Sequence, residues 1–522
     1  MVSLKELDDV IFDLYCSTKG AYTHERELFV PSEVNVEKAL KEINELREKV
    51  KSLKESLNNE VWVQHLLDLL DGMEIILQDN KRHPAKYIRA LGNSISRLLE
   101  EPRRYEIRAE ILSPKLSNID QFFKEMRRLC LTSTDPRIDR AIACASSLSI
   151  EADNNKKTIQ AWAKKRGEKP SDLKKTYKSA VEGLTKLELL ARRFVKDAED
   201  IKKQERKMLE DVGFDDLVEK RYGLDFEWIL SWYQKDFEEV RQKVRELAAE
   251  IDPTKEPIDV LKEHIHVPYD TPEEMFAAMK QFLETAREKS RAYIDLPDGE
   301  SCRVIGVKEI AREDHPMGHS GGPDPVKGRL VSTVSLNQYN FRAFTRGWLM
   351  MMAIHEAYPG HNIQWTKVSV EKLPRTFKVT GGKEVPLVEG LAHRSEELLQ
   401  HIYGDKAFPL FVAWRRFQTI LRVYIEMGLF HLKTMTPEEA ARLYMDEMDM
   451  SEETARGLVV WHLENRGYNV CYYTGYRMLT EMRDKTLKMS EKDFNNKLFS
   501  AGFISMKNVK TLLGIEEKLS WE

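Results

Sequence analysis

Apolar residues recur at three- and four-residue spacing along most of the first 300 residues, and this periodicity constrains the fold more than any other feature. Segments 36–57, 62–78 and 179–212 are the longest examples. The spacing is typical of amphipathic helices that bury one face. The pattern returns after Asn340 and runs on without an internal repeat of fixed period. The chain is therefore predicted to be mainly α-helical.

One short region departs from the helical pattern. Residues 302–310 and 329–337 are rich in β-branched side chains that alternate with polar ones, and a Gly/Pro-rich segment, 316–325, lies between them. Such runs are typical of short strands joined by a loop. We expect one small antiparallel β-sheet at about 302–337, directly before the helix that carries the most informative residues.

The composition excludes several classes of protein. With 25 Gly and 19 Pro in 522 residues, the chain is neither collagen-like nor of low complexity. A net charge of −4 produces no field that would recruit nucleic acid or an anionic membrane. The longest apolar stretch, 347–354, is shorter than the roughly 20 residues of a membrane helix. We therefore expect no nucleic-acid partner and no membrane association.

The cysteines and the first residues bear on the compartment. Five cysteines are scattered without a CxxC pair, at positions Cys16, Cys130, Cys144, Cys302 and Cys471. This distribution favours a reducing compartment over a disulfide framework. The first residues carry acids where a signal peptide needs an apolar core. Together these features predict a cytoplasmic protein, while its oligomeric state stays open.

The segment 347–365 carries the strongest chemical signal. His355 and Glu356 follow an apolar helical run, and His361 follows a Pro-Gly pair. In the common zinc hydrolase pattern the second histidine is four residues after the first, on one helix face, whereas here it is six residues after. Pro359 and Gly360 are expected to break the helix and to return His361 towards His355. Glu356 would then be placed to deprotonate a water molecule.

A catalytic zinc ion needs a third protein ligand and one open position. The segment 385–399 offers candidates on a returning helix, with Glu389 as the first choice and His393 as the alternative. Glu396 is a candidate to orient a ligand histidine through a hydrogen bond. For Glu396 and Glu397 the alternative interpretation is a solvated acidic face on an amphipathic helix, and it is favoured for Glu397.

A third cluster, residues 464–483, is rich in tyrosine. Its tyrosines are candidates to stabilise a developing oxyanion through their hydroxyls, and Arg477 is a candidate to bind a substrate carboxylate. The four tyrosines are Tyr468, Tyr472, Tyr473 and Tyr476. The competing interpretation is an aromatic packing stripe on a core helix, and spacing alone favours it.

Three segments together resemble a known family. HEAYPGHNIQ (355–364), VEGLAHRSEEL (388–398) and NVCYYTGYRMLTEMR (469–483) are similar, in this order, to the signature blocks of the DUF885 family, domain of unknown function 885. The resemblance is firm from about Tyr222 onwards, which suggests a helical N-terminal region, 1–221, and a helical catalytic region, 222–522. Two departures are Leu391, where the family has an aromatic residue, and 469–471, which replaces a Gln-rich approach to the late tyrosine.

The resemblance implies a fold and a mechanism. DUF885 proteins look like distant relatives of helical zinc peptidases such as carboxypeptidase Taq and angiotensin-converting-enzyme-like proteins, with a large helical fold around a deep cleft. Carried over onto this chain, the ligands of one zinc ion would be His355, His361 and Glu389, with Glu356 as general base. Tyr472 matches the family's late tyrosine and Tyr476 lies one turn further on, so one of these two would stabilise the oxyanion.

We therefore expect a zinc-dependent hydrolase, a peptidase of carboxypeptidase or dipeptidase type in which metal-activated water attacks the amide carbonyl of a short peptide. Other divalent metals remain open. One alternative is a zinc hydrolase of a non-peptide amide or ester. A second is a non-catalytic helical binding protein with a vestigial metal site, although the intact Glu356 argues against it.

Two further expectations concern substrate binding. By analogy with related peptidases, the strand Val331–Ser335 would pair with an extended substrate backbone. The candidates to bind a terminal carboxylate are, in order, Arg477, Arg466 and Arg342.

Overall fold

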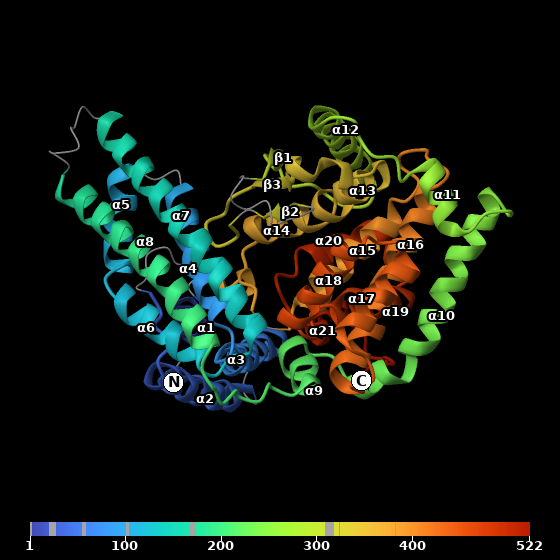
Figure 1. Cartoon of the computed structure of the whole chain (residues 1–522). Coiled ribbons are helices and arrows are strands. Elements are labelled where there is room, and N and C mark those ends of the chain that lie inside the picture. Colours follow the sequence, from blue (N-terminus) through green and yellow to red (C-terminus); the bar gives the residue numbers. More distant parts are fainter. Residues whose placement is uncertain are drawn as a thin grey trace. The chain divides into compact units, whose positions relative to one another are not determined.

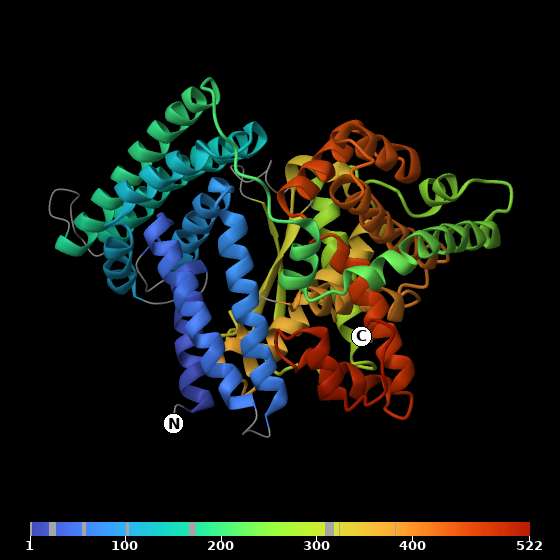
Figure 2. The ribbon, with the colours of Figure 1, turned by 90° about the horizontal axis from the view of Figure 1, so that it is seen from below.

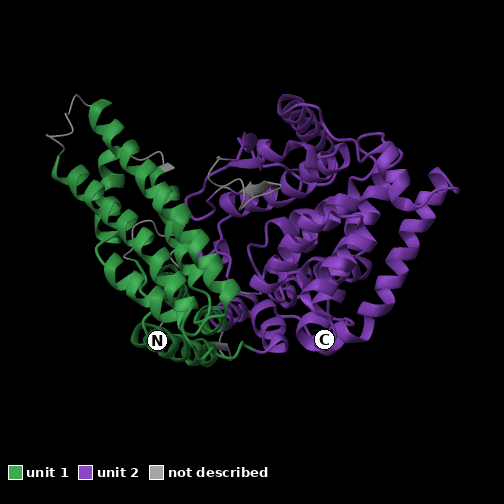
Figure 3. Cartoon of the chain, in the orientation of Figure 1, with its two compact units in different colours: residues 1–56, 73–212 green, residues 57–72, 213–522 purple. Residues whose placement is uncertain are grey.

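The computed structural model describes residues 3–19, 28–54, 59–100, 104–165, 174–307, 318–322, 324–381 and 383–522. Within these ranges the chain is mainly helical with one small sheet (Figure 1), which confirms the predicted fold class. The chain divides into two compact units (Figure 3): residues 1–56 with 73–212 form unit 1, and residues 57–72 with 213–522 form unit 2. The sequence-based division into 1–221 and 222–522 stays a prediction.

Unit 1 is built from helices around a core of its own. Its elements are α1 (Leu4–Lys19), α2 (Glu33–Lys54), the second part of α3 (Glu60–Asn80), α4 (Pro84–Glu100), α5 (Tyr105–Lys115), α6 (Ile119–Cys130), α7 (Asp135–Lys165) and α8 (Lys175–Lys202). The long helices α7 and α8 lie side by side (Figures 1 and 2). Phe122, Phe123 and Phe194 are fully buried between them and their neighbours. The periodic segment 179–212 is helical only as far as Lys202.

Unit 2 contains the three segments with candidate site residues. Its helices are α9 (Phe214–Asp216), α10 (Phe226–Ile251), α11 (Pro257–His264), α12 (Pro272–Ser290), α13 (Arg346–Met352), α14 (His361–Val370), α15 (Val385–Leu398), α16 (Phe408–Glu426), α17 (Pro437–Met448), α18 (Glu452–Glu464), α19 (Val470–Lys485), α20 (Glu491–Phe499) and α21 (Met506–Leu513), together with the start of α3. Short 3₁₀ or π turns cover 217–221, 338–343, 353–357, 375–378 and 427–431. One continuous apolar core joins these elements.

The sheet of unit 2 differs from the predicted one. Its strands are β1 (Ser301–Gly306), β2 (Gly318–Gly321) and β3 (Val331–Leu336), in the order β1-β3-β2. β1 pairs with β3 in parallel, and only β2 is antiparallel to β3, so the expected antiparallel pairing of the two main strands is wrong. The connection 307–330 is long enough for the crossover that parallel strands need. Part of it, 308–317 and 323, lies outside the described residues.

Two glycines allow α15 and α19 to cross closely. A Cβ atom on Gly475 would lie 1.9 Å from the carbonyl oxygen of Pro386, and a Cβ atom on Gly390 would lie 2.5 Å from the carbonyl carbon of Gly475. No side chain fits at either position, so both helix backbones approach each other directly. This crossing brings the glutamate and histidine of α15 next to the tyrosines of α19.

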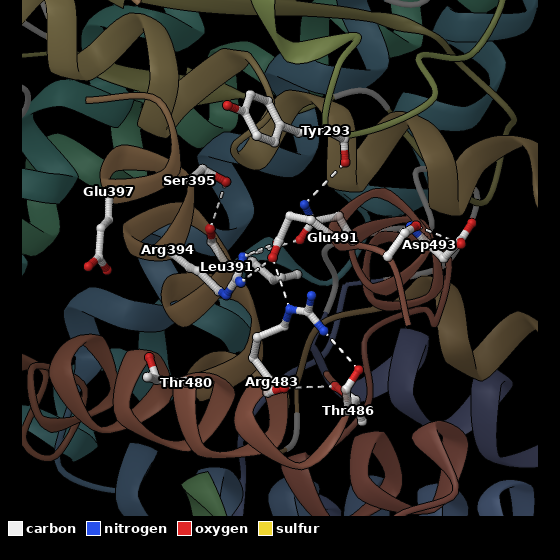
Figure 4. A network of polar contacts seen from close by, with 12 residues as sticks. Tyr293, Leu391, Arg394, Ser395, Glu397, Thr480, Arg483, Thr486, Glu491 and Asp493 are labelled. Carbon is white, nitrogen blue, oxygen red and sulfur yellow. Dashed lines mark hydrogen bonds and ion pairs between the residues drawn. The ribbon is translucent and has the colours of Figure 1, made fainter. Parts of the chain in front are cut away.

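A polar network also holds α15 in place (Figure 4). Arg394 of α15 donates from Nη1 and Nη2 to the two carboxylate oxygens of Glu491, at 2.7 and 3.0 Å, and Arg483 of α19 donates from Nε to Glu491 Oε2 at 2.9 Å. Burial of Glu491 opposes ionisation, but these two arginines hold the pKa of its carboxyl below the ordinary value. One carboxylate at the start of α20 therefore joins α15, α19 and α20.

Candidate metal centre

The His-Glu segment changes its backbone conformation twice within ten residues. Helix α13 continues as a π turn over Ala353–Ala357, and α14 begins at His361 with Gly360 as its N-cap. The amide of Tyr358 donates to the carbonyl of Ala353 at 2.9 Å, and Pro359 has no amide hydrogen to continue the helical bonds. The predicted break at the Pro-Gly pair is therefore present, and His361 starts a new helix.

Gly360 is required at the bend for a steric reason. Its φ is −62° and its ψ is −137°, which is neither a helical nor an extended conformation. A Cβ atom at this position would lie 1.7 Å from the carbonyl oxygen of His355. The chain can fold back over His355 only if residue 360 has no side chain. This close approach places His361 beside His355, with ring centroids 4.9 Å apart.

Three predicted ligands converge. Glu389 Oε2 lies 3.8 Å from His355 Nε2 and 3.7 Å from His361 Nε2, and the three candidate ligand atoms lie within 4.8 Å of one another. His355 and Glu389 are buried, whereas His361 keeps 14% of its side-chain surface exposed. We call His355, His361 and Glu389 the HHE group. Its three residues come from the π turn before the bend, from α14 after the bend, and from α15.

The donor atoms of the HHE group fit a metal ion. Glu389 Oε2 is buried and has no hydrogen-bond partner among the described residues, although two imidazole nitrogens lie nearby. Ligands bound to zinc at 2.0–2.2 Å in tetrahedral geometry are about 3.4 Å apart, close to the separations seen here. Imidazole nitrogen and carboxylate oxygen are both usual zinc ligands. The group is therefore a possible metal-binding group.

Glu396 orients His355. His355 Nδ1 lies 2.7 Å from Glu396 Oε1, so in the neutral ring Nδ1 donates to Glu396 and the Nε2 lone pair is on the side of Glu389. Glu396 is fully buried. Burial opposes its ionisation, but His393 and His355 hold the pKa of this carboxyl well below its ordinary value. An ionised carboxylate behind a ligand histidine fixes the ring and raises its basicity.

His393, the alternative ligand, lies on the other side of Glu396. His355, His393 and Glu396 form a second group of atoms within 4.8 Å of one another, and His393 Nδ1 is 3.3 Å from Glu396 Oε1. Burial lowers the pKa of His393 to about 4, so its ring is neutral. In this second group His355 Nδ1 is already hydrogen-bonded to Glu396. The HHE group therefore offers the better set of donors.

Two tyrosines of the third segment border the HHE group. The Tyr468 hydroxyl donates to Glu389 Oε1 at 2.5 Å. The Tyr472 ring lies 5.6 Å from those of Tyr468 and His393. Burial and the Glu389 charge raise the pKa of Tyr472, so its hydroxyl stays protonated. Glu356 is half-buried beside these groups, and its charge acts on His355, His361 and Tyr472.

The other polar candidates lie in different surroundings. Tyr476 donates to Glu397 Oε2 at 2.6 Å and stacks under Arg416. Arg477 is paired with Asp236 of α10. Arg466 packs over Phe430 and the exposed Arg342 over Phe341. None of these four side chains has a described contact with the HHE group.

The predicted role of β3 in substrate binding is not supported. β3 lies between β1 and β2, and Ser335 is in register with Ile305 on one side and His319 on the other. The backbone of 333–336 therefore has no edge to which a substrate strand could be added. Val331, at the start of β3, is 43% exposed.

Sequence reasoning missed three residues near the centre. Tyr468 is one of four tyrosines that the sequence alone does not distinguish, and its hydroxyl contacts Glu389. Arg415 and Arg422 belong to α16, which is otherwise largely apolar. Charged residues inside such an apolar helix are the signal that could have drawn attention to them.

Solved structures with the same fold cover almost the whole chain. One is a "putative lipoprotein of unknown function from Shewanella oneidensis", with a TM-score of 0.75, 16% identity, and coverage of 98% of this chain and 100% of that one. Another is a "putative lipoprotein from Colwellia psychrerythraea", with a TM-score of 0.74, 13% identity, and coverage of 98% and 99%. At these identities the likeness establishes the fold alone. No curated protein matches the sequence.

The predicted cytoplasmic location is contradicted by these neighbours, because both are described as lipoproteins. Charge, cysteine spacing and apolar content describe the folded chain and do not determine the compartment to which it is delivered. Among the described residues, no helix combines the length and apolar character needed to cross a bilayer.

A sequence model of one protein family matches most of the chain. The family described as "Bacterial protein of unknown function (DUF885)" matches residues 20–513, which include the N-terminal half where the motifs alone are weak. The three motif segments that carry the resemblance all lie within this match. The chain therefore belongs to the DUF885 family.

Proposed function

We propose that this protein is a zinc-dependent hydrolase that cleaves amide bonds of short peptides. The observation that carries the proposal is the arrangement of Glu389 Oε2, buried without a hydrogen-bond partner among the described residues, 3.7 and 3.8 Å from two imidazole nitrogens. Glu356 stands next to His355 in sequence and is half-buried at the same place. A closed structural metal site has no use for such an additional carboxylate.

In this proposal His355, His361 and Glu389 hold the metal. A zinc ion held there would act as a Lewis acid and would lower the pKa of a water molecule to about 7. Glu356 accepts a proton from the attacking water and delivers it to the leaving amine. Glu396 keeps His355 in the required orientation, and Tyr468 does the same for Glu389 through its hydroxyl.

Tyr472 is the tyrosine best suited to stabilise the oxyanion. Its raised pKa keeps the hydroxyl protonated, so it can donate a hydrogen bond to developing negative charge. Tyr476, the other sequence candidate, already donates to Glu397. We therefore assign the donor role to Tyr472 alone.

The test compares wild type with Glu356→Gln. Both proteins, loaded with zinc, are incubated with a mixed peptide library, and products are identified by mass spectrometry while zinc content is measured separately. We expect cleavage by wild type only, with about one zinc per chain in both. Glu397→Gln, on the same helix as Glu389 but bonded to Tyr476, is the matched control and should cleave like wild type.

Two outcomes would contradict the proposal. Absence of cleavage by zinc-loaded wild type would favour a non-peptide amide or ester, or a binding protein. Full activity of Glu356→Gln would show that this carboxylate is not the base.

A further inference from the structure

Two arginines of α16 lie near Tyr472 and the candidate metal centre, and neither has an acidic partner among the described residues. Arg415 is only 6% exposed and Arg422 is half-buried. They are seven residues apart, which places them about 20° from each other around a helix. Both therefore extend from the same side of α16.

Their contacts leave donors unused. Arg415 donates from Nη1 to Gln418 Oε1 and stacks over Trp348, with 4.6 Å between Cζ and the ring centroid. Arg422 stacks over Tyr472 at 4.8 Å, and its guanidinium interacts with the hydroxyls of Tyr472 and Tyr444. The Nε atoms of both arginines are buried without a partner in the described part of the chain. Neither guanidinium forms an ion pair with a described carboxylate.

Two other arginines of unit 2, Arg416 and Arg394, are paired with carboxylates. Arg416 lies next to Arg415 in sequence, yet it donates to the carbonyl of His393 at 3.2 Å and pairs with Glu397 at 3.7 Å. Arg394 is bonded to both oxygens of Glu491. A buried guanidinium is costly unless an anion compensates it. Among the described residues, Arg415 and Arg422 therefore lack the carboxylate partner that Arg416 and Arg394 have.

The two arginines are close to the reacting groups of the proposed function. Tyr472 carries the ring under Arg422, and both arginine charges act on its hydroxyl together with Glu389 and Glu356. The charges of Glu396 and Glu356 likewise act on Arg415, while burial lowers the pKa of Arg415 to about 10. Two cations thus act on the tyrosine to which the proposed function assigns the oxyanion.

We infer that Arg415 and Arg422 bind the C-terminal carboxylate of a peptide substrate, so that the enzyme removes the last residue. This inference rests on the proposed function. A terminal carboxylate is only one residue, about 3.8 Å of chain, beyond the scissile amide, so its binding groups must border the catalytic groups. Guanidinium groups match a carboxylate in charge and geometry.

The reaction is then a simple hydrolysis. The C–N bond before the last residue breaks, the hydroxyl of water is added to the acyl carbon, and the remaining proton goes to the amine nitrogen. The products are a shortened peptide and a free amino acid. Arg477, paired with Asp236, does not take part in this assignment.

The test uses one peptide in two forms. The library peptide that wild type cleaves best is synthesised with a free C-terminal carboxylate and with a C-terminal amide. For wild type we expect kcat/KM to be at least about 30-fold higher for the free acid. In Arg415→Gln and Arg422→Gln the ratio of kcat/KM for the acid to kcat/KM for the amide should fall towards one. Arg477→Gln should keep the wild-type ratio.

The outcomes separate the two proposals. If wild type cleaves acid and amide equally well, the carboxylate assignment is wrong while the peptidase proposal stands. If the acid preference persists in both folded arginine variants, other residues bind the carboxylate. If wild type cleaves no peptide, the proposed function itself fails. Where a glutamine variant does not fold, Arg422→Lys keeps the charge but loses the two-pronged contact, and it should still reduce the acid preference several-fold.

Discussion

The hydroxyl of Tyr468 donates a 2.5 Å hydrogen bond to Oε1 of Glu389, whose other oxygen faces His355 and His361. The bond leaves Oε2 as the oxygen directed at the two histidines. Tyr468 precedes α19, and the preceding residue Gly467 donates its amide to Glu426 Oε2 at 2.7 Å. A buried carboxylate of α16 therefore helps to fix the tyrosine that orients a candidate ligand of α15.

Replacing Tyr468 with phenylalanine should weaken zinc binding. The ring would still pack, but Glu389 would lose the donor that orients it, and loss of such a bond costs about 10- to 100-fold in metal affinity. Competition with a chromophoric chelator measures the affinity. Tyr424→Phe, whose ring stacks on Phe237 of α10, is the control and should bind zinc like wild type. Unchanged affinity in Tyr468→Phe would contradict the orienting role.

Gly360→Ala should disrupt the bend and the HHE group together. The new Cβ would lie 1.7 Å from the carbonyl oxygen of His355, so the backbone must move. We expect a loss of at least about 2 kcal/mol in the free energy of unfolding, with strongly reduced zinc binding.

The matched control for this variant is Gly457→Ala in α18. A Cβ atom there meets nothing within 4 Å. Helical Gly→Ala changes at unstrained sites stabilise by about 0.4–1 kcal/mol. Denaturant titration of both variants, with zinc affinity measured in parallel, gives the comparison. Wild-type stability and zinc binding in Gly360→Ala would show that the bend tolerates a side chain.

Zinc should stabilise the folded protein, and its removal by a chelator should reverse the effect. A ligand that binds only the native state at about 100 times its Kd adds about 2.7 kcal/mol to the free energy of unfolding. Thermal unfolding with and without zinc measures this difference. Glu389→Gln should abolish it. An equal shift in that variant would mean that zinc binds elsewhere in the chain.

His266 should make the stability of unit 2 depend on pH. Burial lowers the pKa of His266 to about 4, with a further contribution from Lys262 that Asp449 opposes, and the ring packs against Phe411 and Trp414. The ordinary value is about 6.5, so the unfolded state binds the proton more tightly. The free energy of unfolding is therefore highest above about pH 6.5, where the ring is neutral in both states, and it decreases as the pH falls from about 6.5 to about 4.

The size of this effect is on the order of 1–3 kcal/mol. Urea unfolding at several pH values between 4 and 7 measures it. His266→Phe keeps a ring against Phe411 and Trp414 and should flatten the pH dependence by this amount. His264→Gln removes an exposed histidine two residues away and should leave the pH dependence as in wild type. Equal slopes for wild type and His266→Phe would contradict the assignment.

The direction in which β1 and β3 pair could not be predicted from the sequence. The residues of β1 and β3 have strand character that alternation reveals, and both strands form where they were expected. Their relative direction depends on the path of the connection 307–330, within which β2 pairs with the other edge of β3. A pattern of alternating residues carries no information about that path.

The sequence by itself determined the helical class, the DUF885 family, and the close pairing of His355 with His361, because helical periodicity and a Pro-Gly break act between residues near in the chain. Only the tertiary structure decided which of four tyrosines contacts Glu389 and which arginines have no acidic partner in the described part of the chain. Those facts depend on helices that meet far apart in sequence: α15 crosses α19 where Gly390 faces Gly475, and Arg422 of α16 stacks on Tyr472. Helix crossings are set by packing of whole surfaces, so no local pattern could have distinguished Tyr468 from Tyr476 or Arg422 from Arg477.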